Sequence, residues 1–345
     1  MKNFLPYFFS FFLIILNTKG IAQQDIHFSQ FYELPMLRNP ALAGIFSGNY
    51  RLTTAYRNQW ESITTPYRSM AMGAEVKVFK GFSEGDFLTA GLQITNDIAG
   101  DSKLKRTQFL PVINYHKLLN TEHNTLLSAA FMGGAVSQGF DPSDLKFDDQ
   151  FVGGNYSTGN VTGQTFNQTS FTYFDLSTGL NLSSLINPDV KFYVGAAIFH
   201  VRKPTLSFIQ NSNVVLNRKI GINAGLSANT GLNGRVVFYA DHFRQGPNTL
   251  TQAGFLYTHS FDEQSEESKL SVSGGAIFRL NDALIPTVKL NTNKLSLGIS
   301  YDTNLSTLKT ASNYRGGFEL TLSYIGLWNA QGEDDEHTKC PSKIW

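Results

Sequence analysis

Histidine, cysteine and carboxylate side chains are the candidates for chemistry in this chain, and their spacing matches no metal-binding motif. The seven histidines include no pair at the i, i+4 spacing of a helical zinc motif, and the single cysteine, Cys340, leaves no partner for a zinc pair or an internal disulfide. Asp241 and His242 are adjacent, so on a strand their side chains would point to opposite faces. We therefore expect no enzyme activity, cofactor or metal. A Ser-His-Asp site assembled from separate strands stays open as the enzymatic alternative.

Alternation of apolar and polar residues is the dominant pattern along the chain. Between residues 70 and 78 one face carries Met, Met, Ala, Val and Val, and the other carries Ala, Gly, Glu and Lys. Since successive side chains of a strand point to opposite faces, such a segment has one oily and one wet side. The pattern predicts about 14 strands, near 49–58, 67–79, 86–97, 104–116, 124–137, 171–184, 190–201, 215–228, 234–244, 249–260, 268–280, 283–291, 294–304 and 314–325.

A soluble β-sandwich would also alternate, but three features favour a membrane barrel. Most segments span about 10–14 residues, longer than the 5–6 of a usual strand and long enough to cross a bilayer at a tilt. Charged residues are 16% of the chain, below the ~25% of soluble domains. The connections differ in length, with a long stretch near 139–170. We predict an all-β fold: a transmembrane, outer-membrane, antiparallel β-barrel. Both termini of the chain are expected on the periplasmic side.

The first residues predict export. Lys2 precedes an apolar run from Phe4 to Leu16, and Gly20 and Ala22 supply the small residues of a signal-peptidase site. The run is shorter than the ~20 residues of a spanning helix. We expect a cleaved signal peptide at 1–22, an N-terminal periplasmic or plug segment at 23–48, a transmembrane barrel at 49–326, and a periplasmic tail at 327–345. The formal charge of +1 predicts no nucleic-acid partner.

An irregular aromatic stretch, HFSQFYELPMLRNPALAG at residues 27–44, precedes the first predicted strand. We expect it to be extended through Tyr32. Asn39 is a good helix cap, Pro40 suits a first helical position, and Gly44 can close the turn. The aromatic side chains need a dry environment, so the stretch either seals the lower opening of the barrel or binds a periplasmic partner. The partner-binding candidates are His27, Phe28, Phe31, Tyr32, Asn39 and Pro40.

Charged residues on the early strands are expected to line the lumen. Arg51 and Arg57 lie on the first predicted strand, and Glu75 and Lys77 on the second. Pairing of these charges to brace the lumen is the favoured role, with a conduit lining as the alternative. His200 lies at a strand exit, where a turn-stabilising hydrogen bond is favoured and partner contact is the alternative.

Several motifs together resemble one family. They are the 27–44 stretch, Tyr56-Arg57-Asn58-Gln59-Trp60, Leu145-Lys146-Phe147-Asp148-Asp149-Gln150, Ser300-Tyr301-Asp302, Gly316-Gly317-Phe318-Glu319-Leu320 and Cys340-Pro341. They make the chain similar to the PorP/SprF outer-membrane proteins of Bacteroidetes. The resemblance implies a barrel of the type IX secretion system, which also serves gliding motility. It further implies help in the export or surface attachment of large adhesins with a C-terminal sorting domain, and association with periplasmic ring and lipoprotein components.

The stretch at residues 27–44 also leaves a second function open. Long-chain fatty-acid channels carry Asn-Pro-Ala in their plugging segment, as residues 39–41 do here. The alternative is therefore a diffusion channel for hydrophobic small molecules.

Overall fold

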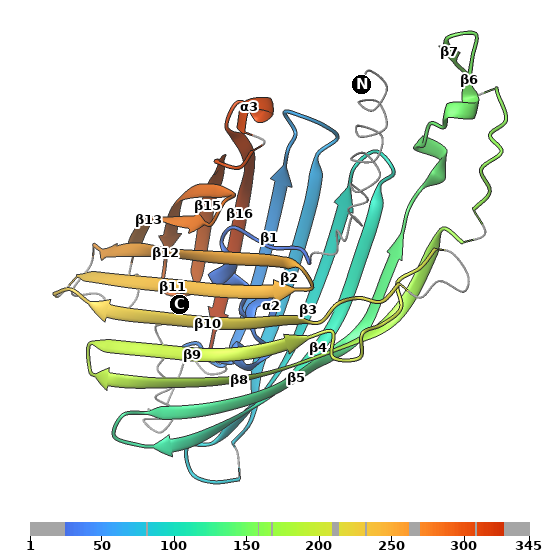
Figure 1. Cartoon of the computed structure of the whole chain (residues 1–345). Coiled ribbons are helices and arrows are strands. Elements are labelled where there is room, and N and C mark those ends of the chain that lie inside the picture. Colours follow the sequence, from blue (N-terminus) through green and yellow to red (C-terminus); the bar gives the residue numbers. More distant parts are fainter. Residues whose placement is uncertain are drawn as a thin grey trace, which may run out of the picture.

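The computed structural model describes residues 25–80, 82–157, 159–166, 168–208, 214–231, 233–261, 270–307 and 309–327. The expected signal peptide and most of the expected tail lie outside these residues. Fourteen antiparallel strands form one closed barrel, in which β1 pairs with β16 and closes the ring (Figure 1). The strands are β1 (Tyr50–Gln59), β2 (Tyr67–Lys80), β3 (Phe87–Ala99), β4 (Leu104–Asn120), β5 (Thr125–Gly139), β8 (Ser170–Asn187), β9 (Val190–Phe199), β10 (Lys219–Asn229), β11 (Gly234–Gln245), β12 (Asn248–Ser260), β13 (Ser271–Arg279), β14 (Ala283–Asn291), β15 (Leu295–Asn304) and β16 (Arg315–Gly326).

The predicted barrel and its strand number are confirmed. The largest boundary error at a strand start is at β10, which begins at Lys219 and not near 215, because Val215 instead forms an isolated bridge with Thr205. Pro111 and Pro286 lie inside strands. The ladders from β4 to β5 and from β14 to β15 are interrupted at these two positions, as the missing N–H of proline requires.

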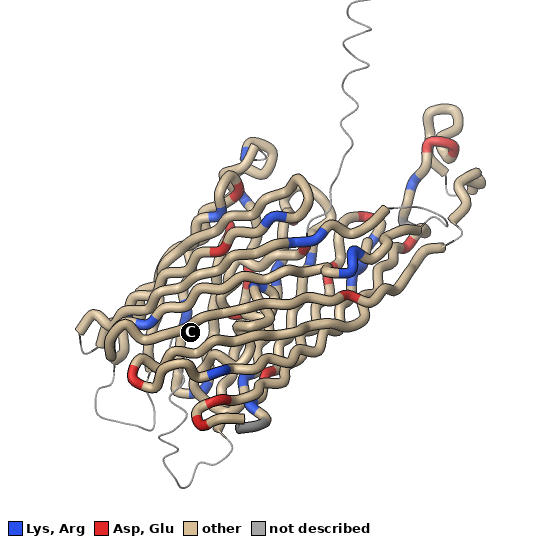
Figure 2. Tube along the Cα trace, turned by 60° about the horizontal axis from the view of Figure 1, so that its bottom comes forward, with Lys and Arg blue, Asp and Glu red and all other residues tan. Residues whose placement is uncertain are grey.

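The barrel is apolar outside and polar inside, the reverse of a soluble protein. Met72, Ile222 and Val288 project outward and are more than half exposed, while Asn114 and Glu319 project inward and are fully buried. Lys, Arg, Asp and Glu are a minority of the positions along the wall (Figure 2). This arrangement fits a wall that faces lipid. Among the described residues, no helix has the length and apolar character to cross a membrane.

The two ends of the barrel differ. The end that holds the start of β1 and the close of β16, here called the turn end, has the connections 81–86, 121–124, 188–189, 230–233, 261–270 and 292–294. The opposite end, here called the loop end, carries the long connections 140–169 and 200–218. The first of these includes the hairpin of β6 (Phe151–Val152) and β7 (Asn155–Tyr156), which stands clear of the barrel (Figure 1).

Residues 25–48, here called the plug, lie inside the barrel. The expectation of an extended chain through Tyr32 is wrong, because η1 (Phe31–Glu33) is already a 3₁₀ turn. After α2 (Pro35–Arg38) comes η2 (Pro40–Leu42), where Asn39 caps the turn by accepting a hydrogen bond from the N–H of Ala41 (2.9 Å). Gly44 follows with a φ of +85°. The predicted turn at Asn39–Gly44 is confirmed, and it lies in the lumen, enclosed by the barrel wall.

The described part of the predicted periplasmic or plug segment lies inside the lumen. The plug does more than seal the lower opening, since it runs along the lumen from the loop end to the turn end. Its apolar side chains form the core together with inward-facing wall residues such as Val112 and Tyr239. Burial of these side chains inside the wall explains why so irregular a segment is ordered.

Candidate functional site

The plug is held to the wall at successive levels, and the first is a group of charges at the loop end. Asp25 binds Arg106 (Oδ1–Nη1, 2.8 Å), His200 (Oδ2–Nε2, 2.8 Å) and Lys219 (Oδ2–Nζ, 3.3 Å). The other ring nitrogen of His200 lies 2.8 Å from a carboxylate oxygen of Asp175 on β8. We call Asp25, Arg106, His200 and Lys219 the latch. His200 follows β9 directly with a φ of +56°, so its side chain turns back into the barrel mouth.

Asp25 and His200 form the central pair of the latch, and their pKa shifts favour the charged form of both at neutral pH. Burial raises the pKa of Asp25, but the charges of His200, Lys219 and Arg106 outweigh burial and hold that pKa well below its usual value. Burial lowers the pKa of His200, but Asp25 and Asp175 outweigh burial and raise it to about 9. Asp25 and His200 therefore form an ion pair within the latch, and both side chains are largely buried.

A second level joins the plug to β1, β13, β15 and β16. Oδ2 of Asp302 lies 2.6 Å from Nη2 of Arg57 and 3.2 Å from Nη2 of Arg279. Its Oδ1 accepts a hydrogen bond from the hydroxyl of Ser29 (2.5 Å). Glu319 accepts hydrogen bonds from the backbone N–H groups of Ser29 (2.6 Å) and of the next residue (2.7 Å). Charge-assisted bonds of this kind are the strong ones, so the wall holds the plug backbone itself.

The third level is built around Arg38 at the end of α2. Its guanidinium pairs with both carboxylate oxygens of Asp241 (2.6 and 2.8 Å) and donates to the hydroxyl of Tyr193 (2.7 Å). The same group lies 4.9 Å from the ring centre of Phe31. Tyr32 stacks on a wall tyrosine, Tyr239, with 4.9 Å between ring centres. A bidentate pair enclosed by aromatic rings fixes one orientation of the plug.

The fourth level holds the Asn39–Pro40 turn. The side-chain amide of Asn39 donates to the carbonyl of Leu180 (2.9 Å) and to Asn223 (3.0 Å). The amide of Asn114 donates to the carbonyls of Ala41 (2.9 Å) and Ala43 (2.7 Å). Near the turn end, Glu75 accepts from the N–H of Gly44 (2.7 Å) and Lys77 donates to the carbonyl of Phe46 (2.9 Å).

One wall position at this level, Gly179, has room for glycine only. A Cβ added to Gly179 on β8 would lie 1.9 Å from the amide oxygen of Asn39, whereas a Cβ added to Gly274 on β13 would meet open space. We predict that Gly179→Ala lowers the free energy of unfolding by about 1–3 kcal/mol, because the plug must shift, and that Gly274→Ala changes it little. Denaturant unfolding of the purified barrels measures both. Equal stability of the two variants would contradict this packing.

The structure separates the predicted lumen residues into two groups, all inside the barrel. Arg51 pairs with Glu75 (2.6 Å) at the turn end, beside Lys77, while Arg57 belongs to the Asp302 level. The partner-binding candidates of the plug are all turned inward. Buried or half-buried positions hold His27, Phe28, Phe31, Tyr32, Asn39, Pro40 and His200.

Sequence reasoning missed several residues that hold the plug. Asp25, Arg38 and Arg279 were given no role of their own, and Asp241 was considered only beside His242, although Asp241 and Arg279 sit at inward positions of their strands. Asp302 and Glu319 lie within motifs quoted for the family resemblance, which was the one available signal. A Gly-x-Ser-x-Gly match at residues 81–85 also passed unnoticed. Its Ser83 sits between two strands, not before a helix, and accepts from Lys117 (3.1 Å), so it forms no nucleophile elbow.

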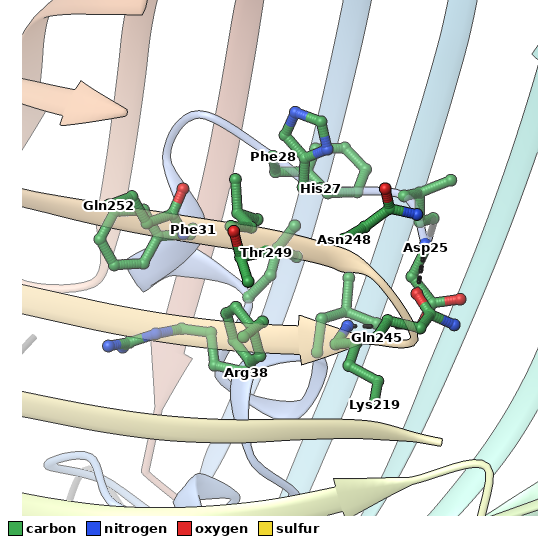
Figure 3. A pocket seen from close by; sticks show the side chains of 15 residues that line it. Asp25, His27, Phe28, Phe31, Arg38, Lys219, Gln245, Asn248, Thr249 and Gln252 are labelled. Carbon is green, nitrogen blue, oxygen red and sulfur yellow. Dashed lines mark hydrogen bonds and ion pairs between the residues drawn. The ribbon is translucent and has the colours of Figure 1, made fainter. Parts of the chain in front are cut away.

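Little space remains beside the plug. One lumenal cavity of about 40 Å³ is lined by plug residues between Asp25 and Arg38 and by side chains of β10, β11 and β12 (Figure 3). A second, of about 20 Å³, lies next to His200. Within the described parts of the chain, no group of three or more His, Cys, Asp or Glu could hold a metal ion.

An apolar outer wall, an inward polar face and a lumen filled by the chain's own N-terminal segment together define a plugged outer-membrane β-barrel. The model of the type IX secretion system membrane protein PorP/SprF family matches residues 20–324, and the chain belongs to this family. It is therefore a membrane component of type IX secretion, located in the outer membrane. No curated protein matches the chain.

Solved barrels are similar in fold. The toluene transporter TodX of Pseudomonas putida is 9% identical, with 88% of this chain and 95% of that chain covered and a TM-score of 0.47. The KdgM porin is 7% identical, with 79% and 98% covered and a TM-score of 0.35. The translocator domain of the autotransporter NalP from Neisseria meningitidis is 10% identical, with 85% and 95% covered and a TM-score of 0.35.

Proposed function

We propose that this barrel assists the export or surface attachment of large adhesins with a C-terminal sorting domain, as an anchored accessory of the type IX machinery that also serves gliding motility. It works by position and not by catalysis. The observation that carries the proposal is the filled lumen: four levels of buried contacts hold the plug, and the cavities beside it hold about 40 and 20 Å³. A polypeptide has no path through such a barrel, so the protein acts through its two ends.

The loop end is the proposed holding surface for the exported protein. The β6–β7 hairpin projects there, and its Phe151 and Val152 are more than half exposed. Exposed apolar residues on a projecting hairpin are suited to contact another protein. The turn end and the tail at 327–345 are the proposed docking region for periplasmic ring and lipoprotein components. Cleavage after Ala22 is part of the same proposal.

A hydrophobic diffusion channel is the second candidate, and one observation favours it. The 40 Å³ cavity has apolar walls from Phe28, Phe31 and Leu250 beside polar Lys219. That volume is well below the ~150 Å³ of an apolar protein cavity that takes up benzene. A channel function would therefore require the plug to move first.

Deletion of the gene tests the proposal. We expect surface display of a specific adhesin to be lost, while other type IX substrates are still secreted, and we expect the wild-type gene to restore display. Display should also fall in a strain whose barrel lacks residues 151–156, because this hairpin is part of the proposed holding surface. The deletion leaves the barrel strands intact. Normal display combined with reduced uptake of hydrophobic solutes would instead support the channel.

A further inference from the structure

We propose that the chain enters its own barrel from the loop end, so that Asp25, the first residue that the structure describes, lies at the cell-surface opening and not on the periplasmic side. This inference is independent of the adhesin role, because it concerns only the path of the plug.

The contacts of the plug follow its sequence from one barrel end to the other. Asp25 binds Arg106 near the start of β4 and Lys219 at the start of β10, and both strands start at the loop end. The N–H of Asp25 donates to Gln245, the last residue of β11, which also ends at the loop end (3.0 Å). At the other limit, the N–H of Asn49 donates to the carbonyl of Gly326, where β16 closes at the turn end (2.9 Å). The plug thus crosses the lumen once.

The lumen beside the plug offers little room for a second extended segment. Such a segment needs a cross-section of roughly 5 Å by 10 Å, from the spacing of strands and of packed sheets. The two lumenal cavities beside the plug hold about 40 and 20 Å³. The barrel opening nearest Asp25 is therefore that of the loop end.

The latch fixes Asp25 at the loop end, and the wall holds the three cationic groups of the latch without help from the plug. Arg106 also donates to the hydroxyl of Tyr173 (3.2 Å). His200 is oriented by Asp175, and the ammonium group of Lys219 lies 4.5 Å from the ring centre of Phe199. Three oriented cations form a ready site for one carboxylate, and Asp25 fills it. The plug is therefore fastened at its outer end as well as through β1.

Epitope accessibility on intact cells tests the path. A short epitope inserted directly before Asp25 should bind antibody on intact cells as strongly as one inserted between Gly153 and Gly154 of the β6–β7 hairpin. A matched insertion at Asn293, in the turn between β14 and β15, should bind only after the outer membrane is permeabilised. Each variant is first checked for a folded barrel by its heat-dependent migration in gels.

Detection of the N-terminal epitope only after permeabilisation, with the hairpin epitope accessible, would overturn the proposal. A smaller change covers the case in which the insertion prevents folding. In a Cys340→Ser background, a cysteine in place of Gln24 should react with a membrane-impermeant maleimide on intact cells, and a cysteine in place of Asn293 should not. Reaction of the Asn293 position alone would reverse the assigned orientation and overturn the proposal equally.

Discussion

Replacing Asp302 with alanine is expected to lower the free energy of unfolding by about 3–5 kcal/mol, the cost of breaking a buried ion pair by removing one partner. The carboxylate is almost fully buried and balances two guanidinium groups, those of Arg57 and Arg279, while it also accepts from Ser29 of the plug. Without it, two buried cations face each other, and the remaining carboxylates are Glu319 beside Arg57 and Asp282 beside Arg279. The loss therefore acts on the wall and on the plug together.

Asp282 offers a matched control. It also pairs with Arg279 (2.7 Å), but 42% of its side chain is exposed at the loop end. Asp282 is screened by solvent and Arg279 keeps its pair with Asp302, so Asp282→Ala should lower the free energy of unfolding by only about 0–1 kcal/mol. Denaturant unfolding of the refolded barrels measures the difference. Similar losses in both variants would show that burial of the Asp302 cluster is not what stabilises the plug.

The wall could be predicted from sequence because each strand carries its own signal. In β2 the alternating Met70, Met72 and Val76 reveal the lipid face without reference to any other strand. Closure could be predicted as well, since a bilayer permits no open sheet edge. The early start predicted for β10 shows the limit: Val215 suits a strand, but its bridge partner, Thr205, belongs to a loop that local sequence does not define.

The plug contacts could not be predicted because they join residues far apart in the chain. Asp25 meets Arg106 across 81 positions, and Ser29 meets Glu319 across 290. Local periodicity contains no information about such pairs. The aromatic residues of the plug did indicate a need for burial, and Asn39 and Pro40 did indicate a turn, but nothing in the segment itself showed that it runs the length of the lumen.

Removal of the plug is expected to give the largest functional change. A barrel of this size without its N-terminal segment encloses a polar lumen, and wide barrels with empty polar interiors conduct ions. Deletion of residues 27–43 removes the plug residues of the second and third levels and the Asn39–Pro40 turn of the fourth, and it leaves the strands whole. Deletion of residues 148–164 removes an equal length of the loop end and leaves the lumen filled, so it serves as the matched control.

Single-channel conductance in planar bilayers is the measurement that tests most directly whether this protein is a closed anchor or a conduit. The wild-type barrel and the 148–164 deletion are expected to show no steady open state, and the 27–43 deletion is expected to show a large and stable one. A steady, large conductance of the wild-type barrel would contradict the account, because the plug would then not close the lumen.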